Sequence, residues 1–193
     1  KIVEGPSFQL RGTPGNPEIV NLNVRDNIVL KIGTPRKLRN LNGTVLSLLT
    51  GGGGNNNYWH WLFDVLPRLN LCNKVTNLNN VDFFLLPNLL KKFQDETLNF
   101  LNIPKHKRLS SKKFRHIKAN ELIVTDHPVV VSGDASEDHN DPPAWIIQWL
   151  RDNFLNENII TNKKKIKIYI DRDLKNYNQS FQRKIENEEE VKK

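Results

Sequence analysis

Residues 51–69 read GGGGNNNYWHWLFDVLPRL, and this stretch sets the expectations for the rest of the chain. It follows a compact apolar run at 43–50 that has the length and composition of a strand. Asn56 or Asn57 can cap a helix that begins here, because an asparagine side-chain oxygen accepts from the free amides of a first turn. Pro67 limits that helix, since proline has no N–H to donate and its ring disfavours helical geometry in the preceding residue. We therefore expect a strand, a glycine turn and a short helix that kinks or breaks near Pro67.

Segments with strand and helix patterns alternate from residue 44 onward, which predicts an α/β fold with a mainly parallel sheet. The strand patterns are runs of apolar residues, whereas the helix patterns repeat apolar residues at a spacing of three to four. The expected strands are 43–50, 81–86, 121–125, 129–131 and 166–170, and the expected helices are 56–71, 88–101 and 143–155.

The chain divides by pattern into three segments. Residues 1–42 are expected to be β-rich and irregular, residues 43–170 to form one α/β domain, and residues 171–193 to lead into a further domain. The 193 residues include no Met, and they end on the charged run NEEEVKK, which resembles the opening turn of a helix. We therefore expect the chain to be a fragment of a longer protein.

Composition narrows the classes of partner and compartment. The net charge of +8 suits an anionic partner, such as a nucleotide diphosphate, an acidic polysaccharide, a membrane surface or nucleic acid, or else reflects a lysine-rich solvated surface. The basic run at 105–118 contains a single aromatic residue, whereas nucleic-acid platforms interleave aromatics with cations, so we read this run as a solvated loop. The single cysteine, Cys72, favours a reducing compartment.

A polar stripe is the first candidate for chemistry. Asn57, His60 and Asp64 are spaced i, i+3 and i+7, so they share one face of a helix. A carboxylate one turn from an imidazole can orient that imidazole or act as a base itself. In open α/β sheets, ligands bind at the carboxyl ends of strands, where this helix begins. The alternative is a solvent-facing or core-satisfied His–Asp pair with no chemical role.

Phosphate and metal motifs are weak elsewhere. The four glycines at 51–54 match neither phosphate-loop pattern and have no following lysine, so a tight turn is the safer interpretation. Asp171 and Asp173 resemble a D-x-D metal motif. Arg172 and Arg183 follow the last expected strand and suit a diphosphate, or are surface charges. The histidines outside the stripe show no metal-ligand spacing: His106, His116, His127 and His139.

Two segments resemble glycosyltransferase family 61, which includes bacterial capsular-polysaccharide enzymes, plant xylan pentosyltransferases and secretory-pathway O-linked N-acetylglucosaminyltransferases. Residues 57–69 resemble its N-x-x-H-W-x-x-D-x-L-P-R-L motif. Residues 168–172 and 183–191 resemble its Y-I-S-R and R-x-I-x-N-E-x-E-V segments, with Asp171 in place of the usual Ser. The family continues into a second domain with a glycine-rich H-G-A segment, which this sequence lacks.

The resemblance implies a two-domain GT-B architecture. This chain would be its Rossmann-like N-terminal, acceptor-side domain, without the C-terminal donor domain and therefore inactive by itself. It further implies inverting transfer without a metal or other cofactor. His60 and Asp64 would sit where the base is needed, with Asp64 favoured as the base and His60 as the orienting or polarising group, although the choice between the two stays open.

The same resemblance implies how the donor is bound. Arg172 and Arg183 would neutralise the leaving diphosphate of a nucleotide sugar, of the UDP type. Asn57 would contact substrate, and Asn187 and Glu188 would shape the domain junction or contact donor or acceptor.

The expected function is therefore sugar transfer to a glycan or lipid-linked glycan acceptor in capsular or surface polysaccharide synthesis. The expected location is the cytoplasm, with peripheral membrane association and without nucleic acid as a partner. Two alternatives remain open from the sequence. One is a non-catalytic glycan-binding module derived from the same family, and the other is a basic nucleic-acid-binding domain.

Overall fold

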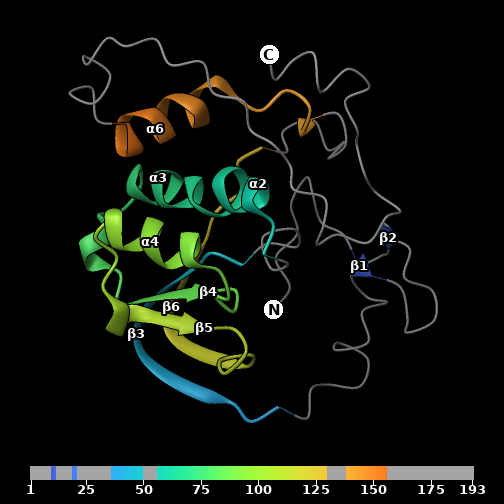
Figure 1. Cartoon of the computed structure of the whole chain (residues 1–193). Helices are drawn as coiled ribbons and strands as arrows, with labels where there is room; N and C mark the ends of the chain where they lie inside the picture. Colours follow the sequence, from blue (N-terminus) through green and yellow to red (C-terminus); the bar gives the residue numbers. More distant parts are fainter. Residues whose placement is uncertain (1–9, 12–18, 21–35, 50–55, 130–137, 156–193) are drawn as a thin grey trace, which may run out of the picture. The chain divides into compact units, whose positions relative to one another are not determined.

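The computed structural model describes residues 10–11, 19–20, 36–49, 56–129 and 138–155 (Figure 1). Chain contacts divide the protein into Lys1–Asn156 and Glu157–Lys193, and every described element belongs to the first unit. Near the N-terminus, β1 (Leu10–Arg11) pairs antiparallel with β2 (Ile19–Val20). The strand expected at 166–170 lies outside the described residues.

A four-stranded sheet is the base of the domain, and its strands run parallel in the order β5-β4-β3-β6. This arrangement confirms the α/β class and the parallel sheet. The strands are β3 (Arg39–Ser47), β4 (Phe83–Leu86), β5 (Arg108–Ser110) and β6 (Ile117–Val124).

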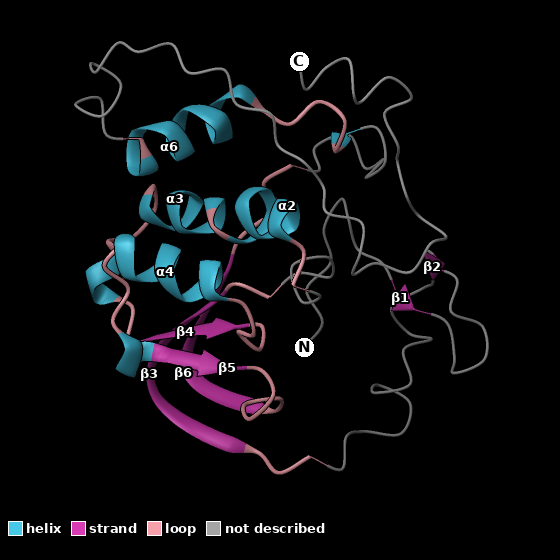
Figure 2. Cartoon of the chain, in the orientation of Figure 1, coloured by secondary structure: helices cyan, strands magenta, loops and turns pink. Residues whose placement is uncertain are grey.

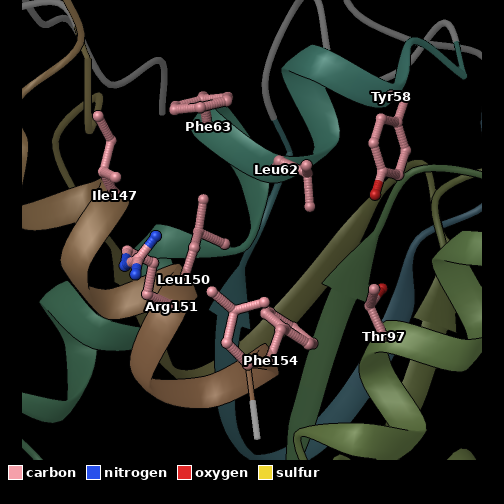
Figure 3. Close-up of a pocket in the computed structure, with 9 residues that line it drawn as sticks. Tyr58, Leu62, Phe63, Thr97, Ile147, Leu150, Arg151 and Phe154 are labelled. Carbon is pink, nitrogen blue, oxygen red and sulfur yellow. The ribbon is translucent and has the colours of Figure 1, made fainter. Parts of the chain in front are cut away.

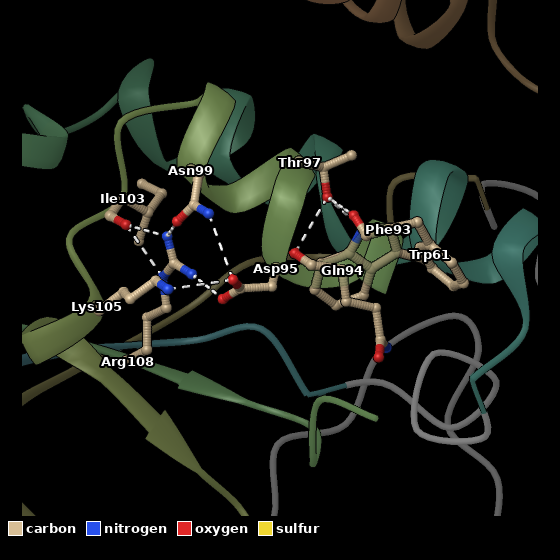
Figure 4. Close-up of polar contacts among 9 residues, drawn as sticks. All are labelled: Trp61, Phe93, Gln94, Asp95, Thr97, Asn99, Ile103, Lys105 and Arg108. Atoms are coloured by element: carbon tan, nitrogen blue, oxygen red, sulfur yellow. Dashed lines mark hydrogen bonds and ion pairs between the residues drawn. The ribbon is translucent and has the colours of Figure 1, made fainter. Parts of the chain in front are cut away.

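Two strands differ from expectation. β3 begins at Arg39, four residues before the predicted start, and so spans the boundary expected between residues 42 and 43. β5 lies inside the basic run that we had read as a loop. Its Arg108 side chain is 7% exposed and donates to the Asp95 carboxylate at 2.7 Å, to the side-chain oxygen of Asn99 at 2.8 Å and to the main-chain oxygen of Ile103 (Figure 4). In these contacts protein oxygens take the place of water around the Arg108 guanidinium.

The helical elements after β3 are α2 (Tyr58–His60), a π-helical turn η3 (Trp61–Val65) and α3 (Pro67–Asn73). The Leu66 N–H donates to the Trp61 carbonyl at 3.1 Å, an i to i−5 bond, so the chain widens just before Pro67. The sequence predicted a kink or break here, and the structure resolves it as a π-turn. Widening accommodates a proline that can neither donate to the carbonyl four residues back nor sit close to it.

Two of the remaining helices, α4 (Lys92–Phe100) and α6 (Ala144–Phe154), lie within predicted helices with shifted bounds. Two short 3-10 turns, η4 (Leu78–Asn80) and η5 (Lys105–Lys107), were not predicted. α4 starts at Lys92, because the Gln94 side-chain oxygen accepts from the N–H groups of Leu90 and Lys91. Residue 129 is not part of a strand. No described helix is long and apolar enough to cross a membrane.

The core lies between the sheet and α2, η3, α3 and α4, which Figures 1 and 2 show on one side of it. Alternate strand residues face this layer, and Trp61 packs among them fully buried. The Trp61 indole N–H donates to the Thr97 hydroxyl at 2.9 Å, which in turn donates to the Phe93 carbonyl at 2.7 Å (Figure 4). The buried tryptophan therefore has its polar atom satisfied. α6 packs against α3.

Gly43 forms an irregularity in β3 where the register with β6 shifts. Its φ is +137°, and a Cβ there would lie 2.3 Å from the Asp82 Oδ2 atom. That same oxygen accepts from the Thr44 N–H at 2.8 Å, while the Asp82 N–H donates to the Thr44 carbonyl at 3.0 Å. Glycine therefore allows the close approach of two neighbouring strands.

Arg68 ties α3 to the end of β6 and is 5% exposed. Its Nε donates to the Asp64 carbonyl at 2.9 Å, and its Nη1 donates to the carbonyl and hydroxyl of Thr125 at 3.2 and 3.4 Å. Burial lowers the pKa of Arg68, an effect that the charges of Asp64 and Asp126 oppose. One guanidinium thus fixes the helix that carries Asp64 to the strand beside it.

Gly43→Ala is expected to lower the free energy of unfolding by about 1–3 kcal/mol, because alanine would be strained at this φ and would meet the Asp82 carboxylate. Urea denaturation followed by circular dichroism measures the loss. Asn42→Ala at the exposed neighbouring position is the control and should change stability by less than about 0.5 kcal/mol. Equal stability of the two variants would contradict this role for Gly43.

Arg68→Lys is expected to destabilise the fold by about 1.5–3 kcal/mol, since one ammonium cannot reproduce the forked contacts to Asp64 and Thr125. The same denaturation experiment measures this loss, with the exposed Arg115→Lys as the matched control. If both lysine variants unfold at the same urea concentration as the parent, the tie does not stabilise the fold.

Candidate functional site

His60 and Asp64 form the centre of the candidate site. The His60 Nδ1 atom lies 2.7 Å from the Asp64 Oδ2 atom, a short contact between an imidazole and a carboxylate. The Asp64 side chain is 2% exposed, whereas the His60 side chain is 28% exposed. The predicted pair is therefore present, with the carboxylate inside and the imidazole at the surface.

Asn57 positions this pair from the start of the helix. Its side-chain oxygen accepts from the N–H groups of Trp59 and His60 at 2.9 and 3.4 Å, which makes it the helix cap. This is one of the two caps that the sequence offered. The substrate contact expected of Asn57 stays a prediction.

The site lies where the topology of the sheet changes direction. From β3 the chain adds β4 and then β5 on one side, and β6 joins β3 on the other. In parallel sheets this arrangement leaves a crevice at the carboxyl ends of the two strands that flank the change. The helix with His60 and Asp64 follows β3 along the chain, and Thr125 and His127 directly follow β6.

Two further histidines approach the buried carboxylate. The Nε2 atoms of His139 and His127 lie 3.5 and 3.8 Å from the Asp64 Oδ1 atom. The His139 ring is also 5.7 Å from the His60 ring and 5.8 Å from the His127 ring, measured between centroids. No metal-ligand spacing relates these histidines along the chain, since they come from separate loops. Their position after a strand end and before a helix was the one signal available.

His127 is neutral near pH 7. Burial lowers its pKa to about 4, despite the attraction of Asp64, and the charges of Arg68, His139 and His60 act in the same direction as burial. The Val129 N–H donates to its Nδ1 atom at 3.3 Å, so the neutral ring carries its proton on Nε2, the atom that faces Asp64. His127 therefore presents an N–H to the carboxylate.

This arrangement supports two kinds of chemistry. A surface imidazole oriented by a buried carboxylate can accept a proton from a bound hydroxyl group. Alternatively, His60, Asp64 and His139 each offer an atom to a metal ion, and these atoms lie within 4.8 Å of one another.

Aromatic rings frame the site. The Trp59 ring stacks on the Phe63 ring at 4.7 Å and lies 5.0 Å from the His139 ring, between centroids. Phe63 and Leu62 also line a separate, largely apolar cavity of about 310 Å³ against α6, with the Arg151 guanidinium beside it (Figure 3). His60 and Asp64 do not line this cavity, so the polar cluster and the apolar cavity lie on different faces of the same helical segment.

The expected donor-binding residues lie outside the described part of the chain: Arg172, Arg183, Asn187 and Glu188. The D-x-D residues Asp171 and Asp173 lie there too. Their roles stay predictions.

Comparison with known proteins supplies the family. No curated protein and no solved structure matches the chain. The family model described as Glycosyltransferase 61 matches residues 58–193, which include the His60–Asp64 pair and most of the chain. The chain therefore belongs to glycosyltransferase family 61.

Proposed function

We propose that the chain is the acceptor-side part of a GT-B enzyme that transfers a sugar, with inversion, from a nucleotide sugar to a glycan acceptor. The observation that carries this proposal is the 2.7 Å contact between His60 and Asp64 at the topological change of the sheet. Family membership supports glycosyl transfer in general. The inverting course, the UDP-type donor and a capsular or surface polysaccharide product are part of the proposal.

The exposures of the pair favour His60 as the group that takes the proton. Asp64 is the base that the family resemblance favoured, yet its side chain is only 2% exposed, against 28% for the His60 side chain. His60 is part-exposed, and its Nε2 atom is the ring nitrogen opposite the one that contacts Asp64. We therefore assign proton acceptance to His60 Nε2 and orientation of the ring to Asp64.

The transfer step then balances as a single displacement. The acceptor O–H bond breaks and its proton moves to His60, while the acceptor oxygen forms a bond to the anomeric carbon. The bond from that carbon to the nucleotide diphosphate breaks, and the diphosphate leaves with the electron pair. Arg172 and Arg183 neutralise its charge in this proposal, because guanidinium groups pair with phosphates through two hydrogen bonds. Asn187 and Glu188 shape the domain junction or contact the donor or the acceptor in this proposal.

The proposed step uses no resident cofactor, since an oriented imidazole supplies the base. In a GT-B enzyme the donor is held largely by the second domain, so we expect residues 1–193 to be inactive by themselves. The acceptor is a glycan or a lipid-linked glycan, at the cytoplasmic side of a membrane.

The nucleic-acid alternative has little support from the described residues. Within the basic run, Arg108 pairs with Asp95, and the Lys107 Nζ atom donates to the Val81 carbonyl at 2.6 Å. These cations serve contacts inside the fold. The glycan-binding alternative is separated from catalysis by the experiment below.

In the full-length protein, His60→Ala and Asp64→Asn are each expected to slow transfer by about 10²–10⁴-fold, the range for a positioned acid–base group. Release of UDP from a panel of UDP-sugars with glycan acceptors measures the rate. Calorimetric titration with UDP should give a similar affinity for the parent and both variants, because neither residue is assigned to the donor.

The exposed His106→Ala and Asp141→Asn are matched controls and should retain the parent rate. Near-parent turnover by both site variants would overturn the assignment. A parent protein that binds glycans and transfers no sugar would favour the binding module instead.

A further inference from the structure

We propose that His60, Asp64 and His139 bind one first-row transition-metal dication, for which Zn²⁺ is a suitable probe. Each side chain offers one ligand atom, and the three atoms lie within 4.8 Å of one another. Two imidazoles and one carboxylate are a ligand set that Zn²⁺ uses in sites with an open position. The inference goes beyond the proposed transfer, since binding of the ion needs neither donor nor acceptor.

The Asp64 Oδ1 atom is the first argument for an ion. Asp64 is buried, and its Oδ1 accepts no hydrogen bond from the residues that the structure describes, whereas Oδ2 contacts His60. A buried acceptor without a donor destabilises the fold, and more so when it is charged. A cation beside Oδ1 would remove that destabilisation. Arg68 does not serve this purpose, because its bond is to the main-chain oxygen of Asp64.

The spacing of the ligand atoms is the second argument. His139 Nε2 lies 3.5 Å from Asp64 Oδ1, which is longer than the usual N–H···O range of about 2.7–3.2 Å. Two ligands that each lie about 2.0–2.1 Å from one tetrahedral ion are separated by about 3.4 Å. The observed separation therefore suits two ligands that share an ion better than it suits a hydrogen bond.

His127 has a different part in the site. Its Nδ1 accepts from the Val129 N–H, so the neutral ring carries the proton on Nε2, and that N–H faces Asp64 Oδ1 at 3.8 Å. A protonated nitrogen cannot coordinate a metal. His127 would thus orient the Asp64 carboxylate without binding the ion, as residues next to metal ligands commonly do.

The ligand types indicate the class of ion, and the exposure of the two histidines indicates how an ion reaches the site. Imidazole ligands favour Zn²⁺ and its neighbours over Mg²⁺ and Ca²⁺, which prefer oxygen ligands. The side chains of His60 and His139 are 28% and 24% exposed, so an ion could enter from their side. Three protein ligands leave a fourth position for water or a substrate oxygen.

The 193-residue chain, stripped of metal by a chelator, is expected to bind one Zn²⁺ in calorimetric titration, whereas Mg²⁺ at the same concentration should give no binding. His139→Ala removes a ligand and should weaken Zn²⁺ binding by more than about 100-fold. His127→Ala removes only support and should weaken it by about 10–100-fold. The exposed His106→Ala is the control and should bind as the parent does.

The decisive result is the order of Zn²⁺ affinities among the parent and its variants. Equal Zn²⁺ affinity for the parent, His139→Ala and Asp64→Asn would overturn the site, as would the absence of binding by the parent. Circular dichroism of each metal-free variant shows whether the fold is kept. If Asp64→Asn unfolds, His139→Ala still tests the proposal. The His139 side chain is part-exposed, so we expect its removal to leave the fold intact.

Turnover of the full-length protein separates this inference from the proposed function. An ion would occupy the lone pairs that proton transfer needs, so Zn²⁺ should inhibit with the same concentration dependence as its binding. Binding with activation would keep the metal site and overturn the metal-free base. No binding, with turnover that depends on His60, would overturn the metal site and leave the base in place.

Discussion

The missing N–H of Pro67 is the constraint on which the candidate site depends. An ordinary α-helix would press the proline ring against the carbonyl of Phe63, at a cost of about 3 kcal/mol or more. The chain instead widens, and Leu66 donates to Trp61 in a π-turn. Asp64 lies within that turn, and its carboxylate is buried while its main-chain oxygen faces Arg68. The local geometry of the helix thus sets both the depth of the carboxylate and the contact that fixes it.

The parallel sheet supplies the second half of the site. Because β6 joins β3 on the side away from β4, the connections after β3 and β6 leave the sheet next to each other. Arg68 joins these two connections through Asp64 and Thr125, and His127 follows two residues later. The buried guanidinium is therefore more than a helix contact, since it sets the distance between the helix and the strand end that carries His127.

The features that could be predicted from the sequence are those that depend on residues close together in the chain. The i, i+4 spacing of His60 and Asp64, the capping by Asn57 and the interruption at Pro67 depend on residues within one or two helical turns. The alternation of strand and helix patterns predicted the parallel sheet, because each pattern is also set by residues close together in the chain. β5 was missed because its three residues lie in a basic run, and the Asp95 partner of Arg108 is supplied by α4 only in the folded chain.

The other side of the site depends on long-range contacts, and the sequence could not supply these. His127 and His139 carry no mutual spacing, and they meet Asp64 only because the loops after β6 and before α6 converge on it. Their arrival changes the chemistry of the His60–Asp64 pair. The Asp64 carboxylate has one oxygen engaged by His60 and the other facing the imidazoles of His127 and His139. Because His127 is neutral, it adds no positive charge beside Asp64, while His60, Asp64 and His139 offer three atoms to a metal ion.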